Sequence, residues 1–145
     1  MKTLALLAIG FMLLASTPAR ADEPLEFTSR SSPGYQHALA AMLEESGIAT
    51  LDLVAAEADF NDDGRIDVMA FALSSYFCGS GGCGPRIYLA GKKGGWRQIE
   101  LYGLGQPENW YLLDSSHNGF RKLAMLDDQG ELIFVWDGSA YVLDE

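Results

Sequence analysis

The sequence is poor in the residues that most often carry catalysis or hold nucleic acid. It contains two cysteines, two histidines and only 10 lysines and arginines against 20 acidic residues, for a formal net charge of −10. A chain this acidic repels nucleic acid and anionic lipid, so we expect it to bind neither. The excess of acid favours metal cations or a basic protein partner, or serves only to keep the protein soluble.

Long apolar runs are also scarce. The run over residues 4–14 is too short to span a bilayer, and no later segment approaches the ~20 apolar residues of a membrane helix. With the cationic Lys2 and an A-x-A pattern ending at Ala21, it predicts a secretory signal peptide over residues 1–21. Cleavage would leave eight bases against 20 acids, a net charge of −12. We expect residues 22–145 to form a single β-rich domain, free in the periplasm and not inserted in a membrane.

One helix and a series of short strands are predicted after the signal peptide. Residues 22–32 are polar and irregular and indicate a loose N-terminal arm. A helix is predicted next, between a Ser32 cap and a Gly47 stop. Apolar runs divided by turn sequences indicate about eight strands at 51–60, 66–76, 86–90, 96–101, 110–113, 122–126, 132–136 and 140–143. The predicted fold is mainly β, an antiparallel meander or small barrel-like sheet with one N-terminal helix.

The stretch DFNDDGRID joins the first two predicted strands and carries oxygen atoms at alternate positions. Calcium takes about six to eight oxygen ligands, and a loop supplies them when a glycine such as Gly64 permits a sharp reversal. The predicted ligands are the side chains of Asp59, Asn61, Asp63 and Asp67 and the carbonyl of Arg65. An EF-hand is disfavoured, because Ala70 stands where its last glutamate would be. The alternative is a turn rich in Asp and Asn that needs no metal.

This acidic loop resembles the calcium loops of FG-GAP and related repeats, in which D-x-[DN]-x-D-G-x-x-D joins two antiparallel strands. The resemblance covers residues 56–73 and does not extend to a propeller, since the chain holds too few repeats. It implies a structural Ca²⁺ ion. A catalytic ion is disfavoured because no evident acid, base or nucleophile stands beside the loop.

The two cysteines, Cys78 and Cys83, lie in FCGSGGCGPR. In the periplasm a disulfide between them is the expected state, and the four small residues between them are flexible enough to close the ring. A structural zinc site would need four ligands, and a redox motif would need C-x-x-C beside a helix. We therefore predict a disulfide and a rigid protruding loop of the kind that contacts a partner.

No catalytic constellation stands out, and we expect the protein not to be an enzyme. His37 lies on the predicted helix, and His117 lies in DSSHNG, where neighbours in one turn do not usually adopt the geometry of a catalytic triad. A glycosidase needs only two carboxylates, so a glycan hydrolase stays an alternative. A calcium-stabilised structural module of the cell envelope is another.

The predicted turns carry aromatic, amide and charged residues that suit a protein interface, where Trp and Tyr are common anchors. The candidate partner-binding residues are Tyr76, Tyr102, Gln106, Glu108, Trp110, His117 and Arg121. For the aromatic members of this set, packing in the core is the alternative.

In being small, exported, acidic, disulfide-stapled and without catalytic machinery, the mature chain is similar to bacterial periplasmic immunity and inhibitor proteins. Its length, signal peptide and short strands resemble those of the immunity protein against a type VI-secreted, calcium-dependent muramidase toxin. The resemblance spans the mature chain and rests on general character, not on a motif. It implies a protein whose loops block the substrate groove of a secreted peptidoglycan hydrolase, with acidic side chains facing basic or sugar-binding residues.

Overall fold

The computed structural model describes residues 21–145, so the predicted signal peptide lies outside the described residues except for Ala21. The described chain forms one helix and eleven strands. In chain order they are β1 (Glu23–Pro24), α1 (Pro33–Ser46), β2 (Leu53–Ala58), β3 (Asp67–Ala72), β4 (Cys78–Gly79), β5 (Gly82–Cys83), β6 (Arg86–Ala90), β7 (Trp96–Leu101), β8 (Trp110–His117), β9 (Phe120–Asp127), β10 (Gly130–Trp136) and β11 (Ala140–Leu143). Within this part of the chain, no helix has the length and apolarity to cross a membrane.

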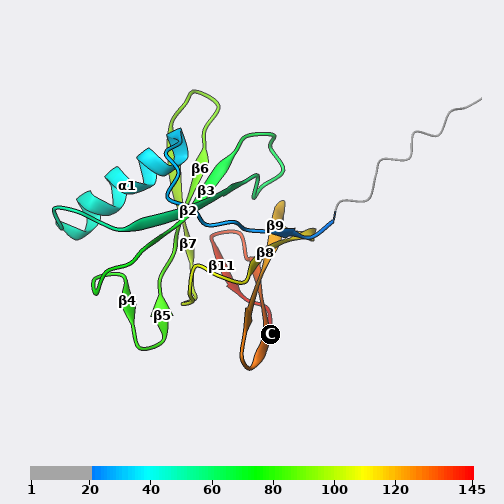
Figure 1. The fold of residues 1–145 in the computed structure, drawn as a ribbon. Helices are drawn as coiled ribbons and strands as arrows, with labels where there is room; N and C mark the ends of the chain where they lie inside the picture. Colours follow the sequence, from blue (N-terminus) through cyan, green and yellow to red (C-terminus); the bar gives the residue numbers. More distant parts are fainter. Residues whose placement is uncertain (1–20) are drawn as a thin grey trace, which may run out of the picture.

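Nine of the strands form one curled sheet in the order β1-β8-β9-β10-β11-β7-β6-β3-β2, and β4 and β5 form a separate ribbon (Figure 1). Every neighbouring pair in the sheet is antiparallel except β11 and β7. The predicted fold class, a mainly β sheet with one N-terminal helix, is confirmed.

The sheet consists of two antiparallel meanders. Strands β2, β3, β6 and β7 follow one another in the first, and β8 to β11 follow one another in the second. The parallel seam between them pairs Ala140 with Glu100 and Tyr141 with Leu101. The loop over residues 102–109 carries the chain from β7 to the far side of the second meander. The sequence gives no sign of this seam, because its two strands are distant in the chain and share no tight turn.

The N-terminal arm, which contains the outer strand β1, connects β8 near one edge of the sheet with β2 at the other. Strand β1 pairs with β8, and the backbone N–H of Leu25 donates to the Trp110 carbonyl at 2.8 Å. Thr28 then exchanges two backbone hydrogen bonds with Ala55 of β2, at 2.9 and 3.0 Å. The prediction of a loose arm was wrong: Leu25 is buried in the core, and these backbone bonds hold the segment in place.

Helix α1 begins and ends at the residues that its caps predict. The Ser32 hydroxyl oxygen accepts a hydrogen bond from the Tyr35 backbone N–H at 3.1 Å, and Gly47 adopts the left-handed conformation with φ 67°. Ala38 and Met42 on the inner face are fully buried against the first meander. The helix therefore covers one face of that meander.

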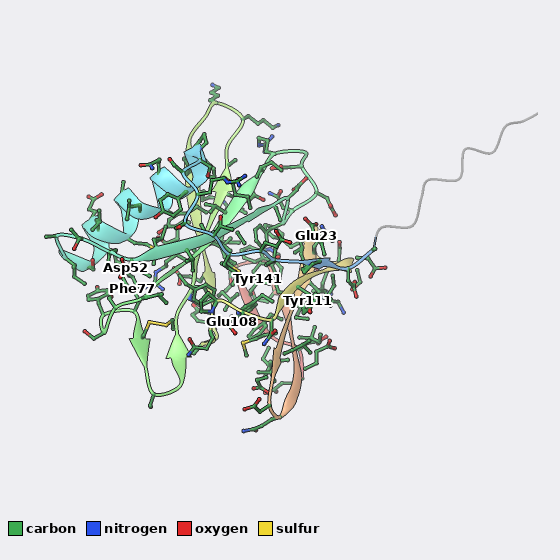
Figure 2. All side chains as sticks on the ribbon, viewed as in Figure 1. Glu23, Asp52, Phe77, Glu108, Tyr111 and Tyr141 are labelled. Atoms are coloured by element: carbon green, nitrogen blue, oxygen red, sulfur yellow. A yellow bond between two sulfur atoms is a disulfide. The ribbon has the colours of Figure 1, made fainter. Side chains whose placement is uncertain are left out.

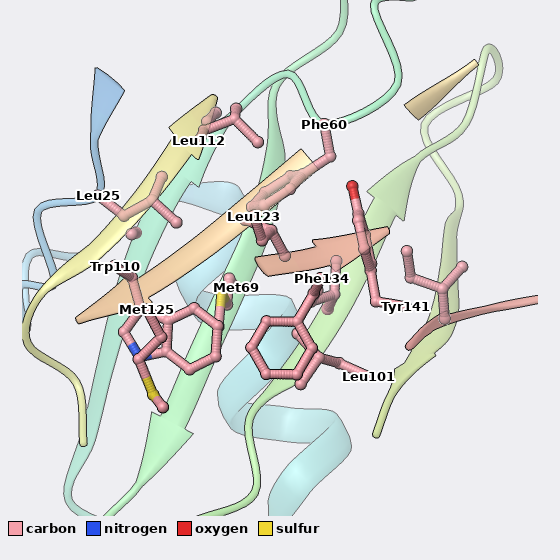
Figure 3. Close-up of a cluster of buried hydrophobic side chains, with 14 of the residues drawn as sticks. Leu25, Phe60, Met69, Leu101, Trp110, Leu112, Leu123, Met125, Phe134 and Tyr141 are labelled. Atoms are coloured by element: carbon pink, nitrogen blue, oxygen red, sulfur yellow. The ribbon is translucent and has the colours of Figure 1, made fainter. Parts of the chain in front are cut away.

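Strand β3 is buried along its whole length because alternate residues enter two different hydrophobic clusters. Val68 and Ala70 face the helix, whereas Met69 and Phe71 face the inside of the curled sheet. Figure 3 shows the cluster inside the curl, where side chains of both meanders meet around Trp110. Burying each large apolar side chain contributes about 1.5–3 kcal/mol, so this cluster stabilises the contact between the two meanders.

Candidate functional site

The acidic loop between β2 and β3 is closed by hydrogen bonds among its own residues. The Asp59 carboxylate accepts from the backbone N–H groups of Asp63, at 3.2 Å, and Gly64, at 2.8 Å. The Asp63 carboxylate accepts from the Arg65 backbone N–H at 2.8 Å and forms an ion pair with the Arg65 guanidinium. Gly64 reverses the chain at φ 82°. These bonds are typical of turns in which an Asp side chain caps the backbone.

Asp67 lies at the first position of β3 and is fully buried. Its two carboxylate oxygens accept from the backbone N–H groups of Phe60, at 3.0 Å, and Ala90, at 2.8 Å. Desolvation raises the pKa of Asp67 to about 6, against the lowering effect of these two bonds, and Asp63 and Asp59 raise it further. This carboxylate fastens the acidic loop to the end of β6.

The loop offers an incomplete fit to the predicted calcium ion. Among the described residues, no group of three or more His, Cys, Asp or Glu side chains is arranged to hold a metal. The Arg65 guanidinium also lies within the loop, where it pairs with Asp63 and donates to the Ala90 carbonyl at 2.8 Å. On the other side, Asn61 Oδ1 is buried and has no hydrogen-bond partner. An ion would satisfy this oxygen, and calcium binding stays a prediction.

At the other end of β3 lies the disulfide. Cys78 and Cys83 are bonded and face each other across the β4–β5 ribbon, so the predicted disulfide is confirmed. The Cys83 N–H donates to the Gly105 carbonyl at 2.8 Å, and the Gly105 N–H donates to the Cys83 carbonyl at 3.0 Å. These bonds fasten the disulfide ribbon to the loop over residues 102–109.

The structure divides the seven candidate partner-binding residues into an exposed and a buried group. Tyr76 and Tyr102 are 54% and 67% exposed, and Gln106, Glu108 and His117 are also exposed. His117 is the last residue of β8, at the acidic-loop end of the sheet, whereas Gln106 and Glu108 lie at the disulfide end. The set is therefore not one surface.

Trp110 and Arg121 are 1% and 0% exposed, so neither side chain is accessible to a partner and the prediction for both is corrected. The Trp110 indole stacks on Phe134 and donates to the Gln106 carbonyl at 2.8 Å. Trp110 is not available to a partner because it begins β8, a strand whose inner face packs into the core. Position near a turn does not reveal on which face of a strand a side chain lies.

Arg121 is buried with its charge, which the sequence does not show. Its guanidinium donates to the carbonyls of Leu113, at 2.8 Å, and Leu112, at 3.1 Å, and pairs with the half-exposed Glu23 at 3.1 Å. A buried cation needs such partners. Arg121 thereby joins strands β8 and β9 to the N-terminal arm.

A hollow of about 360 Å³ lies at the disulfide end and is called here the loop groove. Its apolar lining consists of Leu104, Met125, Leu126 and Leu132. Its polar lining consists of Gln106, Glu108, Asn109, Asp127 and Asp128, with Gly81 and Gly105 completing it. Figure 2 places Glu108 between the disulfide ribbon and the β9–β10 hairpin.

Close packing fixes the floor of the loop groove. A Cβ atom at Gly105 would lie 2.5 Å from the Met125 sulfur and 2.9 Å from Trp110 Cζ2, so only glycine fits. Asn109 has a positive φ of 60°, and its carbonyl accepts from the Leu126 N–H at 2.9 Å. The loop is thus held to β9 as well as to the disulfide ribbon.

The acids of the loop groove, unlike Asp63 of the acidic loop, form no ion pair within the described part of the chain. Within residues 21–145, no salt bridge reaches Glu108, Asp127 or Asp128. Among the described residues, Asp127 accepts from the backbone N–H groups of Gln129 and Gly130. The sequence selected Glu108 but not Asp127 and Asp128, which lie between the predicted strands 122–126 and 132–136. Their closeness to Glu108 depends on the pairing of β8 with β9.

A second hollow, of about 550 Å³, lies between the N-terminal arm, β2 and α1. Two of its acids already have partners: Glu57 accepts from the Ser32 hydroxyl at 2.6 Å, and Glu23 pairs with Arg121.

The His37 side chain of α1 stacks on Trp96 with 5.3 Å between the ring centres, and desolvation lowers the pKa of His37. These contacts are structural.

Comparison with known proteins gives no relative for this chain. It matches no model of a protein family, no curated protein and no solved structure.

Proposed function

We propose that this protein is a periplasmic immunity or inhibitor protein that binds a secreted peptidoglycan hydrolase of the muramidase type and blocks its active-site groove. It acts by binding and catalyses no reaction. A calcium ion in the acidic loop would stabilise the fold and would take no part in the blocking, because the acidic loop and the loop groove lie at opposite ends of β3.

The loop groove is the observation that carries the proposal. Two residues selected from the sequence, Gln106 and Glu108, line it, and Tyr102 is exposed at the start of the same loop. The disulfide and the backbone bonds to Gly105 hold its frame in place before any partner binds. A preformed frame lowers the conformational entropy that binding must remove, which favours tight association.

The charge of the chain supports a basic partner. A net charge of −12 after cleavage would accelerate encounter with a basic surface and slow it as salt rises. We expect the basic surface to bind at the loop groove, because the acids there form no ion pair with any described residue.

The test combines the mature protein with candidate muramidases and amidases and follows the turbidity of a peptidoglycan suspension. We expect one enzyme to lose activity in a stoichiometric manner and the protein alone to cause no clearing. Clearing by the protein alone would identify the glycan hydrolase alternative instead. If every enzyme keeps its activity at a molar excess of the protein, the proposal fails.

A charge reversal locates the inhibitory surface. Glu108→Lys should weaken inhibition by roughly 30-fold or more, the effect of losing ~2 kcal/mol at an interface hot spot. Glu44→Lys, at an exposed position on α1, makes the same change of charge away from the loop groove and is the matched control. Equal effects of the two variants would place the interface elsewhere.

A further inference from the structure

Resting on the proposed function, we infer that the loop groove receives one arginine side chain of the partner enzyme. The inference names the chemical group that occupies the groove. It goes beyond the proposal that the loops of this end contact a hydrolase.

The walls of the groove suit the aliphatic part of a long side chain. Leu104 is 52% exposed and Leu126 is 38% exposed, so both present apolar surface to solvent in the free protein. Leu132 and the largely buried Met125 continue this surface toward the floor. Arginine and lysine bury their methylene stems along such surfaces and keep the charged end at a polar rim.

The rim suits the charged end. Glu108 and Asp128 lie at the groove without a salt bridge to any described residue, and Asp127 is bonded only to neutral backbone groups. Three carboxylates that line one hollow give it a negative charge, which attracts a cation. Elsewhere in the described chain, Glu45 pairs with Arg86 and Asp63 with Arg65, so carboxylates of this protein do take guanidinium partners.

Arginine fits better than lysine or a metal ion. Its planar guanidinium offers five donors, which can be shared between carboxylates and the side-chain oxygens of Gln106 and Asn109. Lysine offers three donors from a single point. A metal ion prefers a shell of oxygen ligands, whereas Leu104, Leu126 and Leu132 line this groove with apolar side chains and no metal-holding group of acids occurs among the described residues.

The inference can be tested without the partner. The mature protein, labelled with ¹⁵N, is titrated with N-acetyl-arginine amide and, as the neutral control of the same shape, N-acetyl-citrulline amide. We expect saturable shifts from the arginine probe at residues 104–109 and 126–128, and affinity for citrulline at least about tenfold weaker, since loss of one charge-assisted contact has that effect. Equal binding of both probes, or shifts centred elsewhere, would overturn the inference.

Variants make the test specific to the rim. The double variant Glu108→Gln, Asp128→Asn should weaken arginine binding by about tenfold or more, whereas Glu44→Gln, Glu100→Gln should leave it unchanged. Unchanged amide shifts outside the groove will show that the variants are folded. Inhibition of a hydrolase without arginine binding would refute this inference alone. Arginine binding without inhibition of any hydrolase would refute the proposed function alone.

Discussion

The two ends of the sheet both carry clustered acids, and they use them differently. At the acidic-loop end, Asp59, Asp63 and Asp67 accept hydrogen bonds from the backbone of their own loop or of β6, and Arg65 neutralises Asp63. At the loop groove, Glu108 and Asp128 have no such partners among the described residues. The first set shapes the fold, and the second is available to another molecule.

The comparison shows that the number of acids in a segment says little about its role. DFNDDGRID has the denser pattern of acids, yet its carboxylates are largely occupied by internal bonds. The acids of the loop groove come from two segments that the sheet brings together. Tertiary contacts therefore decide which acids are free to bind another molecule.

The largest effect is expected at Arg121, which holds the acidic-loop end to the N-terminal arm. Arg121→Met keeps much of the side-chain volume but removes the guanidinium that donates to the Leu112 and Leu113 carbonyls and pairs with Glu23, so we expect a loss of about 3–5 kcal/mol in the free energy of unfolding. Urea denaturation measures it. The neighbouring variant Lys122→Met removes only a partly exposed ion pair with Asp144 at 3.7 Å, and should cost less than about 1 kcal/mol. Similar losses in the two variants would contradict the structural role of Arg121.

Asp67 should make stability depend on pH. Because its folded pKa of about 6 lies above the unfolded value of 3.8, the folded state binds the proton more tightly, and this carboxyl favours folding most at low pH. Its contribution should therefore fall by up to about 3 kcal/mol as the pH rises from 4 to 6 and stay constant above that range.

Asp67→Asn removes the titration, which isolates this effect from the other acids. The free energy of unfolding of the native protein minus that of the variant should be larger at pH 4 than at pH 7. A difference that does not change with pH, measured by denaturation at each value, would show that Asp67 is charged throughout.

Calcium binding would sharpen the contrast between the two ends. At a free calcium concentration a hundredfold above the dissociation constant, the stability of the folded state should rise by about 2.7 kcal/mol, and melting should shift by several degrees between calcium and a chelator. Asn61→Ala removes the unpartnered oxygen and should reduce the shift. No heat of binding and no change in melting temperature would mean that the loop is closed by its hydrogen bonds alone.

The smallest effect is expected at the loop groove. Glu108→Gln and Asp128→Asn remove charges that no described cation balances, so each should change the free energy of unfolding by less than about 0.5 kcal/mol, in either direction. Thermal denaturation measures this. A loss as large as that of Arg121→Met would show that these acids support the fold and are not held ready for a partner.

Local patterns predicted the parts of this fold that depend on neighbours in the chain. The caps of α1, the hairpin around the acidic loop, the disulfide and the bounds of β6, β7 and β11 all follow from residues close in sequence. The parallel seam, the anchored arm and the burial of Trp110 and Arg121 follow from contacts between distant segments. At the site, the sequence identified Gln106 and Glu108 but could not associate them with Asp127 and Asp128, because only the pairing of β8, β9 and β10 brings these residues to one hollow.

The anchored N-terminal arm also bears on the time course of folding. Glu23 meets Arg121 across a sequence separation of 98 residues, and β1 finds its place only beside β8. Contacts between such distant segments form slowly, because the intervening chain must first be ordered. The N-terminal arm therefore cannot take its final place until β8, in the last third of the polypeptide, is ordered. Until then the outer strand β2 and the core around Leu25 lie open, and the folding chain is most exposed to proteolysis and aggregation during that interval.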